Sequence, residues 1–355
     1  MIRKMMLIPT VILFAMFSLT ARSWGEEAKE APAFPPDLIW INSEPLTIKA
    51  LSGKIVLIDF WDYTCVNCIR TFPYLNEWHK RYSKYGLVII GVHTPEFEFA
   101  RDPDNVKKAI AQYGIEYPVV LDNDYKVWNL YGNRYWPNKY IIDQDGRIVY
   151  DHSGEGGYHE TELTLQRLLK KTGTEAVFPA PYMSADKVES GSLCYPMTPE
   201  LYLGYRRARM GNAEGNKPNE VVNYKDSGQY IDGYIYANGL WLNGPESMAH
   251  VKPDRGLNDY IAIKYHAISV NAVIKPRKYK PYRVYVKQDG ADVQRPDWGA
   301  DMRSDEDGRT YLEISESRMY RIIKNEQFGN HILKLYSESD SFDIYAFTFG
   351  SCEIK

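Results

Sequence analysis

The sequence predicts an α/β domain followed by an all-β domain of the sandwich or jelly-roll type. Strand and helix patterns alternate over residues 37–174, whereas short alternating runs rich in tyrosine fill residues 185–355. A proline-containing segment, residues 175–184, separates the two patterns and is the expected linker. The 355 residues, 44% of them hydrophobic, fit two globular domains, and a net charge of −3 gives no footprint of nucleic-acid binding.

Hydrophobic periodicity locates the elements of the first domain. The apolar runs at residues 55–61 and 87–92 predict two buried strands. Between them a helical pattern runs from Ile69 to about Tyr85 and ends at Gly86. The elements expected next are a helix, a short strand, a helical turn, a β-hairpin and a closing helix, at Pro103–Tyr113, Tyr117–Leu121, Tyr125–Leu130, Lys139–Ile142 with Arg147–Tyr150, and Glu160–Lys171. This order predicts a three-layer α/β domain.

The second domain is expected to be antiparallel. Its clearest strands alternate apolar and polar side chains at residues 260–265, 282–286 and 344–349. Turn signals such as Asp-Gly separate these runs, a spacing typical of a sandwich. Most of its tyrosines are expected in the core and in cross-strand pairs, and a few, with Trp241 or Trp298, are candidates for stacking on sugars.

The N-terminal residues have the pattern of an export signal. A short basic region precedes a mostly apolar stretch, residues 5–21, and a small-x-small cleavage site ends at Ser23. We therefore expect a signal peptide over residues 1–23, with retention as an N-terminal membrane anchor as the alternative. A disordered tether is expected over residues 24–36. The expected location is periplasmic or otherwise extracytoplasmic.

Export permits disulfides, and two of the four cysteines lie near the ends of the second domain. The termini of such a domain usually lie close together. Cys194 and Cys352 are therefore expected to form a structural disulfide, with two free buried thiols as the alternative.

Cys65 and Cys68 stand two residues apart where the strand at residues 55–61 meets the following helix. Unpaired amides and the helix dipole favour the thiolate of the first cysteine. The pattern predicts thiol–disulfide exchange through a redox-active Cys65–Cys68 disulfide, without another cofactor or a metal. The alternatives are a structural disulfide, a zinc site, for which no second ligand pair exists, and a thiol peroxidase, for which the expected proline before the cysteine is lacking.

The topology brings further residues to this pair. Right-handed parallel crossovers place the ends of the first two strands at one sheet edge, so Cys65 is expected near His93 and Glu96. The strand after Pro137 is expected to be antiparallel, so its start returns to that edge. Three segments distant in sequence therefore converge on one site.

Several positions carry a resemblance to a known family. Phe60 and Trp61 precede the cysteine pair, Pro73 follows the second cysteine by five residues, and Pro137 precedes a strand and a hairpin. These positions and three longer stretches resemble the thioredoxin fold, its exported TlpA-like redoxin branch and, within that branch, the C-terminal part of the DipZ proteins. The stretches are residues 60–71, 91–97 and 134–140.

The resemblance covers about residues 37–355. In the second domain it rests on residues 198–205 and 331–349, and it implies a β-sandwich similar to a carbohydrate-binding module. In the family that the chain resembles, the redoxin domain comes first and the β-sandwich follows it.

The resemblance implies a role for each residue of the site. Cys65 is the exposed attacking thiolate and Cys68 the buried resolving thiol. Asp59, six residues before Cys65, stands where thioredoxin keeps a buried carboxylate that moves protons to and from the second cysteine. Burial in an apolar strand raises the pKa of such a carboxylate, so that it can act as a base near neutral pH. Pro137 is cis and leaves backbone groups free to pair with a substrate strand.

The remaining candidates for substrate contact are Trp61, His93, Glu96 and Trp136. Trp136 precedes Pro137 and is large enough to narrow the substrate groove. A structural role is the alternative for His93. Thr71 stands where the family's well-known reductants have a glutamate, which leaves proton transfer to Asp59.

The chain is therefore expected to be an exported thiol–disulfide oxidoreductase. The resemblance favours reduction of disulfides in extracytoplasmic client proteins such as apocytochromes, with electrons from a membrane donor of the CcdA or DsbD type. A cell-envelope glycan-binding protein with an accessory redox domain is the alternative. A structural or dimerising role for the second domain also stays open, since a fold does not specify a ligand.

Overall fold

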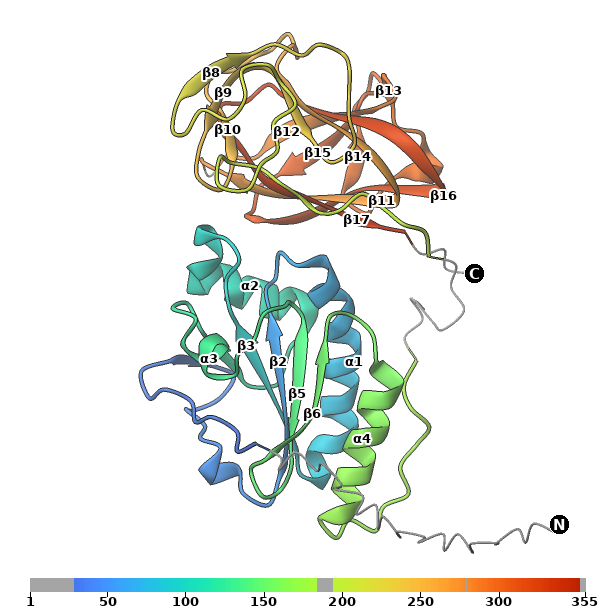
Figure 1. Cartoon of the computed structure of the whole chain (residues 1–355). Coiled ribbons are helices and arrows are strands. Elements are labelled where there is room, and N and C mark those ends of the chain that lie inside the picture. Colours follow the sequence, from blue (N-terminus) through green and yellow to red (C-terminus); the bar gives the residue numbers. More distant parts are fainter. Residues whose placement is uncertain (1–28, 184–193, 279, 352–355) are drawn as a thin grey trace, which may run out of the picture.

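The structure, a computed structural model, describes residues 29–183, 194–278 and 280–351. It has an α/β domain and an all-β domain, which lies above the first in Figure 1. No helix in these ranges is long and apolar enough to cross a membrane. The signal peptide expected over residues 1–23 lies outside the described residues and stays a prediction.

The first domain is built on a mixed six-stranded sheet in the order β1-β4-β3-β2-β5-β6. The strands are β1 (Ile39–Ile41), β2 (Ile55–Trp61), β3 (Leu87–His93), β4 (Val119–Leu121), β5 (Asn138–Ile142) and β6 (Ile148–Ser153). β2, β3 and β4 are parallel neighbours, and the other pairs are antiparallel, as the sequence predicts for the hairpin. β1 has no counterpart in the predicted pattern, because three residues are too few for a periodicity.

Helices cover both faces of this sheet. They are α1 (Val66–Tyr82), α2 (Pro103–Tyr113), α3 (Lys126–Leu130) and α4 (Tyr158–Lys171). The first domain also has three short 3-10 helices, η1 (Lys49–Leu51), η2 (Ser83–Tyr85) and η3 (Glu98–Arg101), and the second domain has one, η4 (Arg295–Asp297). Side chains of α1, α2 and α4 share one core, and those of α3 join another on the opposite face. Along β2, Leu57 and Trp61 join the α1 core, whereas Ile58 and Phe60 join the α3 core. The same alternation places Asp59 on the face that α1 covers.

Residues 29–36 differ from the tether that the sequence predicts. The backbone N–H of Ile148 donates to the carbonyl of Lys29 at 2.9 Å. Phe34 is buried, and its ring meets that of Trp40 edge to face at 5.4 Å between centroids. The expectation of a disordered tether is therefore wrong from Lys29 onward, because this stretch supplies apolar side chains to the α3 core.

The second domain is all-antiparallel in its named strands, which confirms the predicted class. Its eleven-stranded sheet runs β14-β15-β12-β16-β11-β17-β10-β9-β8, with β13 beside β12 and β7 beside β17. The strands are β7 (Leu201–Tyr202), β8 (Val221–Tyr224), β9 (Ile235–Asn243), β10 (Met248–His250), β11 (Tyr260–Pro276), β12 (Tyr282–Gln288), β13 (Ala291–Asp292), β14 (Met302–Ser304), β15 (Thr310–Ile314), β16 (Arg318–Ser337) and β17 (Phe342–Gly350). Register shifts interrupt the β11–β16 pairing, and such irregularities bend long strands. β11 consequently pairs with both β17 and β9 around a core that includes Tyr224, Tyr265 and Tyr320.

The two domains share buried side chains. β11 and β17 run along the side of the second domain that faces the first (Figure 1). Val273, Met319 and Ala346 belong to the same apolar core as the inner side chains of α1 and α2. The ring of Phe99, which follows β3, lies 4.8 Å from that of Tyr345 between centroids. The domains therefore meet at the end of the sheet where β3 terminates.

Cys194 is disulfide-bonded. Cys352 lies outside the described residues, so the pairing of the two cysteines stays a prediction.

Glu162 anchors the expected linker to the first domain. Its buried carboxylate accepts hydrogen bonds from Trp78 Nε1 at 2.8 Å, Tyr82 Oη at 2.6 Å and the backbone N–H of Tyr182 at 2.6 Å. Arg81 Nη1 lies 3.4 Å from the same carboxylate. The segment is therefore fixed to α1 and α4 as far as Tyr182.

We expect Glu162→Ala to lower the free energy of unfolding by about 2–4 kcal/mol, because it leaves several buried donors without an acceptor. Urea denaturation measures this change. Glu160→Ala, an exposed position on the same helix, is the matched control and should change stability by no more than about 0.5 kcal/mol. Equal losses in the two variants would contradict the anchoring role.

Candidate redox site

Cys65 is the N-cap residue of α1. Its Sγ accepts a hydrogen bond from the backbone N–H of Cys68 at 3.3 Å. Cys65 is half-buried and Cys68 fully buried, and both are free thiols in this structure. Because the first amides of a helix stabilise a nearby anion, the accessible Cys65 suits the attacking role and the enclosed Cys68 the resolving role.

Cys68 needs help to ionise. Burial raises the pKa of the Cys68 thiol well above its usual value, and the adjacent Cys65 raises it further. A thiol in this state becomes a nucleophile only when a base accepts its proton. In the described part of the chain, no group of three or more His, Cys, Asp or Glu side chains is arranged to hold a metal ion.

Asp59 lies on the α1 face of β2 and is fully buried. Desolvation raises the pKa of Asp59 to about 7, against an opposing effect of the nearby Lys139 charge. The negative charge of Asp59 in turn contributes to the raised pKa of Cys68, so the two groups sense each other. Neither carboxylate oxygen has a hydrogen-bond partner among the described residues. A buried carboxylate with free lone pairs that titrates near neutral pH can accept the Cys68 proton.

Lys139 is a site residue that sequence reasoning missed. It stands directly opposite Asp59 in the β2–β5 register and is fully buried. Its Nζ lies 5.5 Å from the centroid of the Tyr158 ring and has no hydrogen-bond partner among the described residues. Burial lowers the pKa of Lys139, whereas the charges of Asp59 and Cys68 raise it. The available signal was a lone lysine in an otherwise uncharged buried strand, which is rare without a functional or charged partner.

His93 and Trp61 do not reach the surface. Both side chains are 0% exposed, and the His93 ring stacks on Tyr63 at 5.7 Å and meets Trp61 edge to face at 5.0 Å. Burial lowers the pKa of His93 to about 3, so the ring is neutral at physiological pH. The prediction that these two residues contact substrate is wrong, because aromatic neighbours enclose both rings.

Glu96 lies largely buried at the contact between the two domains. Its Oε1 lies 3.0 Å from Arg207 Nη1 of the second domain, and the side chain is only 10% exposed. The expected nearness of Glu96 to the cysteine loop is correct, since its backbone N–H donates to Asp62 Oδ2 at 2.6 Å. Its carboxylate serves the domain interface, which does not fit the predicted contact with substrate.

The Trp136–Pro137 peptide bond is cis, as expected. Trp136 is half-buried, its Nε1 donates to the carbonyl of Thr94 at 3.0 Å, and its ring lies 4.2 Å from that of Trp128. Tyr135, next to it, is 57% exposed. Trp61 and Trp136 are both predicted to contact substrate, and of the two only Trp136 is partly exposed.

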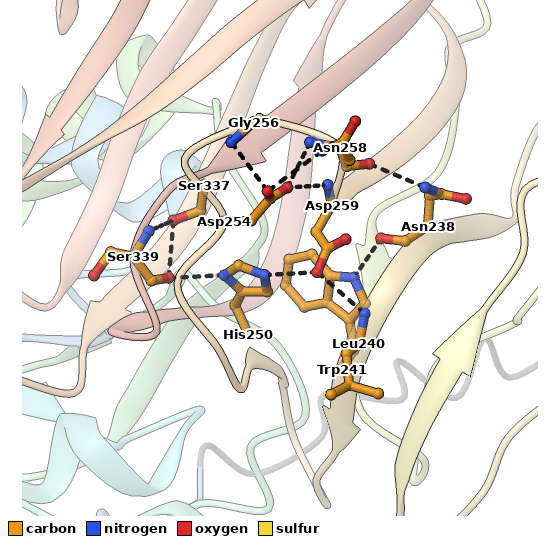
Figure 2. A network of polar contacts seen from close by, with 10 residues as sticks. All are labelled: Asn238, Leu240, Trp241, His250, Asp254, Gly256, Asn258, Asp259, Ser337 and Ser339. Atoms are coloured by element: carbon orange, nitrogen blue, oxygen red, sulfur yellow. Dashed lines mark hydrogen bonds and ion pairs between the residues drawn. The ribbon is translucent and has the colours of Figure 1, made fainter.

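The two tryptophans considered for sugar binding are poorly placed for it. Figure 2 shows Trp241 enclosed in a polar network around His250, and its indole N–H donates to the carbonyl of Asn238 at 2.8 Å. The Trp241 side chain is 0% exposed. Trp298 donates to a backbone carbonyl, and the guanidinium of Arg295 lies 4.5 Å from the centroid of its ring. Trp241 is thus excluded as a stacking platform, and Arg295 lies over a face of Trp298.

Comparison with known proteins matches both domains. The AhpC/TSA family matches residues 28–151, and a domain described as thioredoxin like C-terminal domain matches residues 198–350. Protein DipZ of Mycobacterium tuberculosis is 36% identical over 268 residues, which are 70% of this chain and 36% of DipZ. The chain thus spans about a third of the length of that relative.

Two further proteins match the first domain. The thiol-disulfide oxidoreductase ResA of Bacillus anthracis is 34% identical over 143 residues, which are 40% of this chain and 76% of ResA. The solution structure of a thioredoxin-like protein in the oxidised form is 29% identical and covers 41% of this chain and 97% of its own, with a TM-score of 0.38.

The raised pKa of Asp59 predicts a stability difference with a definite sign. The pKa rises from 3.8 to about 7 on folding, so the protonated carboxyl contributes stability that is lost as the pH rises through about 7. Asp59→Asn should therefore be more stable than the natural protein at pH 8, by roughly 1–4 kcal/mol, and nearly equal to it at pH 4. Guanidinium denaturation at both pH values measures this, and a destabilised variant at pH 8 would contradict the assignment.

Lys139→Met should slow the release of a client by Cys68 at pH 7, roughly three- to tenfold, because loss of the cation leaves less ionised Asp59. Stopped-flow measurement of mixed-disulfide resolution should show the pH dependence moved to higher pH, and Asp59→Asn should remove the transition near pH 7. Lys126→Met, on the surface, is the control. An unchanged pH–rate profile in both site variants would refute the proton-transfer role of this pair.

Proposed function

Because the chain belongs to the thiol–disulfide oxidoreductase family that includes ResA, we propose that it is an exported reductant of disulfides in extracytoplasmic client proteins. The observation that carries the proposal is the arrangement of an accessible Cys65 at the helix cap above a buried Cys68, with Asp59 beneath as the base. The predicted signal peptide supports the extracytoplasmic location.

The reaction proceeds in two exchanges. The Cys65 thiolate attacks one sulfur of a client disulfide, which forms a mixed disulfide and releases the other client sulfur as a thiolate. Asp59 accepts the proton of Cys68, and the Cys68 thiolate attacks Cys65 Sγ. The second client sulfur leaves as a thiolate, and the products are a dithiol client and the Cys65–Cys68 disulfide.

Each turnover oxidises the cysteine pair by two electrons, so a donor must reduce it again. A membrane donor of the CcdA or DsbD type fits an extracytoplasmic reductant, because soluble thiol reductants belong to the cytosol. Trp136, with the neighbouring Tyr135, is the surface on which a client strand would rest beside Cys65.

A glycan-binding role remains the alternative from a different class, with the redox domain as its accessory. It rests on the resemblance of the second domain to a carbohydrate-binding module. The enclosure of Trp241 weighs against it. A thiol peroxidase is less well supported, because Thr64 directly precedes Cys65 and the proline expected before a peroxidatic cysteine is lacking.

Cys68→Ser should retain client attack and accumulate a mixed disulfide through Cys65, whereas Cys65→Ser should abolish insulin reduction. The reduction potential of the Cys65/Cys68 pair, measured against glutathione with Cys194 and Cys352 kept apart from the exchange, should lie near or below roughly −250 mV. A value near roughly −120 mV would make the protein a disulfide donor and overturn the reductive direction.

A further inference from the structure

The loop that follows β3, residues 94–99, is held by the second domain. Arg207 Nη1 donates to Glu96 Oε1 at 3.0 Å. The same guanidinium lies 3.6 Å from the centroid of the Tyr202 ring and 5.1 Å from that of Phe97. Because a planar guanidinium stacks on aromatic rings, these contacts restrain Arg207 in the orientation that reaches Glu96.

Two further contacts from the second domain fix the same loop. The backbone N–H of Glu98 donates to Glu246 Oε2 at 3.0 Å. The rings of Phe97 and Phe99 meet that of Tyr345 edge to face, at 5.3 and 4.8 Å between centroids. The loop beside the redox site therefore depends on the second domain for its position.

Hydrogen bonds connect this loop to Cys65 through Asp62. The backbone N–H of Glu96 donates to Asp62 Oδ2 at 2.6 Å, and Asp62 Oδ1 accepts from the backbone N–H and the hydroxyl of Thr64 at 2.8 and 2.9 Å. The backbone N–H of Cys65 donates to the carbonyl of Asp62 at 3.2 Å. A continuous series of polar contacts thus joins Arg207 to the backbone of the attacking cysteine.

The series contains two enclosed carboxyl groups next to a site that must hold a thiolate. Burial raises the pKa of Asp62 and that of Glu96, and the nearness of Asp62 adds to the effect on Glu96. The positive charge of Arg207 opposes it. The other titratable groups that interact with Glu96 are Tyr125, Glu200 and Tyr202. Arg207 is therefore the cation that offsets the negative charge of Glu96.

We propose that the second domain is an integral part of the redox site, and that Arg207 is a positioning residue that sets the reactivity of the Cys65 thiolate through Glu96 and Asp62. The inference rests on the proposed thiol–disulfide exchange and gives the second domain a role in it. Negative charge near Cys65 disfavours its thiolate, and Arg207 reduces that negative charge.

The test is the rate of Cys65 alkylation by iodoacetamide as a function of pH, in the full chain with the Cys65/Cys68 pair reduced and the Cys65 adduct followed by peptide mass. Loss of Arg207 raises the pKa of Glu96 further, so the comparison is made above that pKa, where Glu96 is still ionised. There Arg207→Met adds net negative charge beside Cys65, so alkylation should be about threefold slower and its midpoint higher. Glu96→Gln removes the negative charge with little change in shape, so alkylation should be faster and its midpoint lower. The double variant should return toward the natural protein.

Arg206→Met is the matched control. Arg206 adjoins Arg207 in the sequence, but its side chain is 62% exposed and its one ion pair among the described residues is a distant contact with Glu246 at 3.9 Å. Its loss should therefore leave the alkylation curve unchanged. Opposite shifts in the two single variants support the proposal, because a loss of structure alone would move both in the same direction. Unchanged midpoints, or shifts of the same sign, overturn it.

Alkylation requires no client and no electron donor, so this outcome is separate from that of the proposed function. If the natural protein fails to reduce insulin, the proposed function falls, while the alkylation curves still decide the role of Arg207. If reduction proceeds and the curves of all variants coincide, the proposed function stands and the inference about the second domain falls.

Discussion

The in-register parallel pairing of β2 with β3 is the constraint on which the rest of this structure depends. Its register runs from Ile55 opposite Leu87 to Trp61 opposite His93, so both strands end at one level. The helix that carries the cysteine pair and the loop that carries Glu96 therefore start side by side. The same level of the sheet provides the surface on which the second domain rests, as Phe99 and Tyr345 show.

The site beneath Cys68 places two ionisable groups where water does not reach them. Asp59 and Lys139 lie opposite each other on adjacent strands, and neither side chain makes a hydrogen bond to another described residue. Burial favours the neutral form of each group, so it raises the pKa of Asp59 and lowers the pKa of Lys139. Such an arrangement costs stability, and proteins retain it where a proton has to move near neutral pH.

The second domain contributes to the first in two ways. Its strands supply Val273, Met319 and Ala346 to the core beneath α1. Its Arg207 reaches Glu96 beside the redox loop. Because the second domain shares a core with the first and forms an ion pair with it, it is not an accessory module that moves freely. The burial of Trp241 removes one sugar-stacking candidate, because its ring completes the domain's own core.

The sequence by itself determined the strands β2 to β6 and the helices α1 to α4 of the first domain, the antiparallel class of the second and the cysteine pair at the cap of α1, because periodicity and cap chemistry are local. Tertiary structure decided which charged groups meet. Lys139 faces Asp59 only through the β2–β5 register, and Arg207 finds Glu96 across 111 residues only when the domains dock. It also decided that His93 is enclosed, and that residues 29–36 lie against the sheet. Strand register and domain docking depend on many weak contacts between residues far apart in the sequence, and a local sequence pattern does not contain that information.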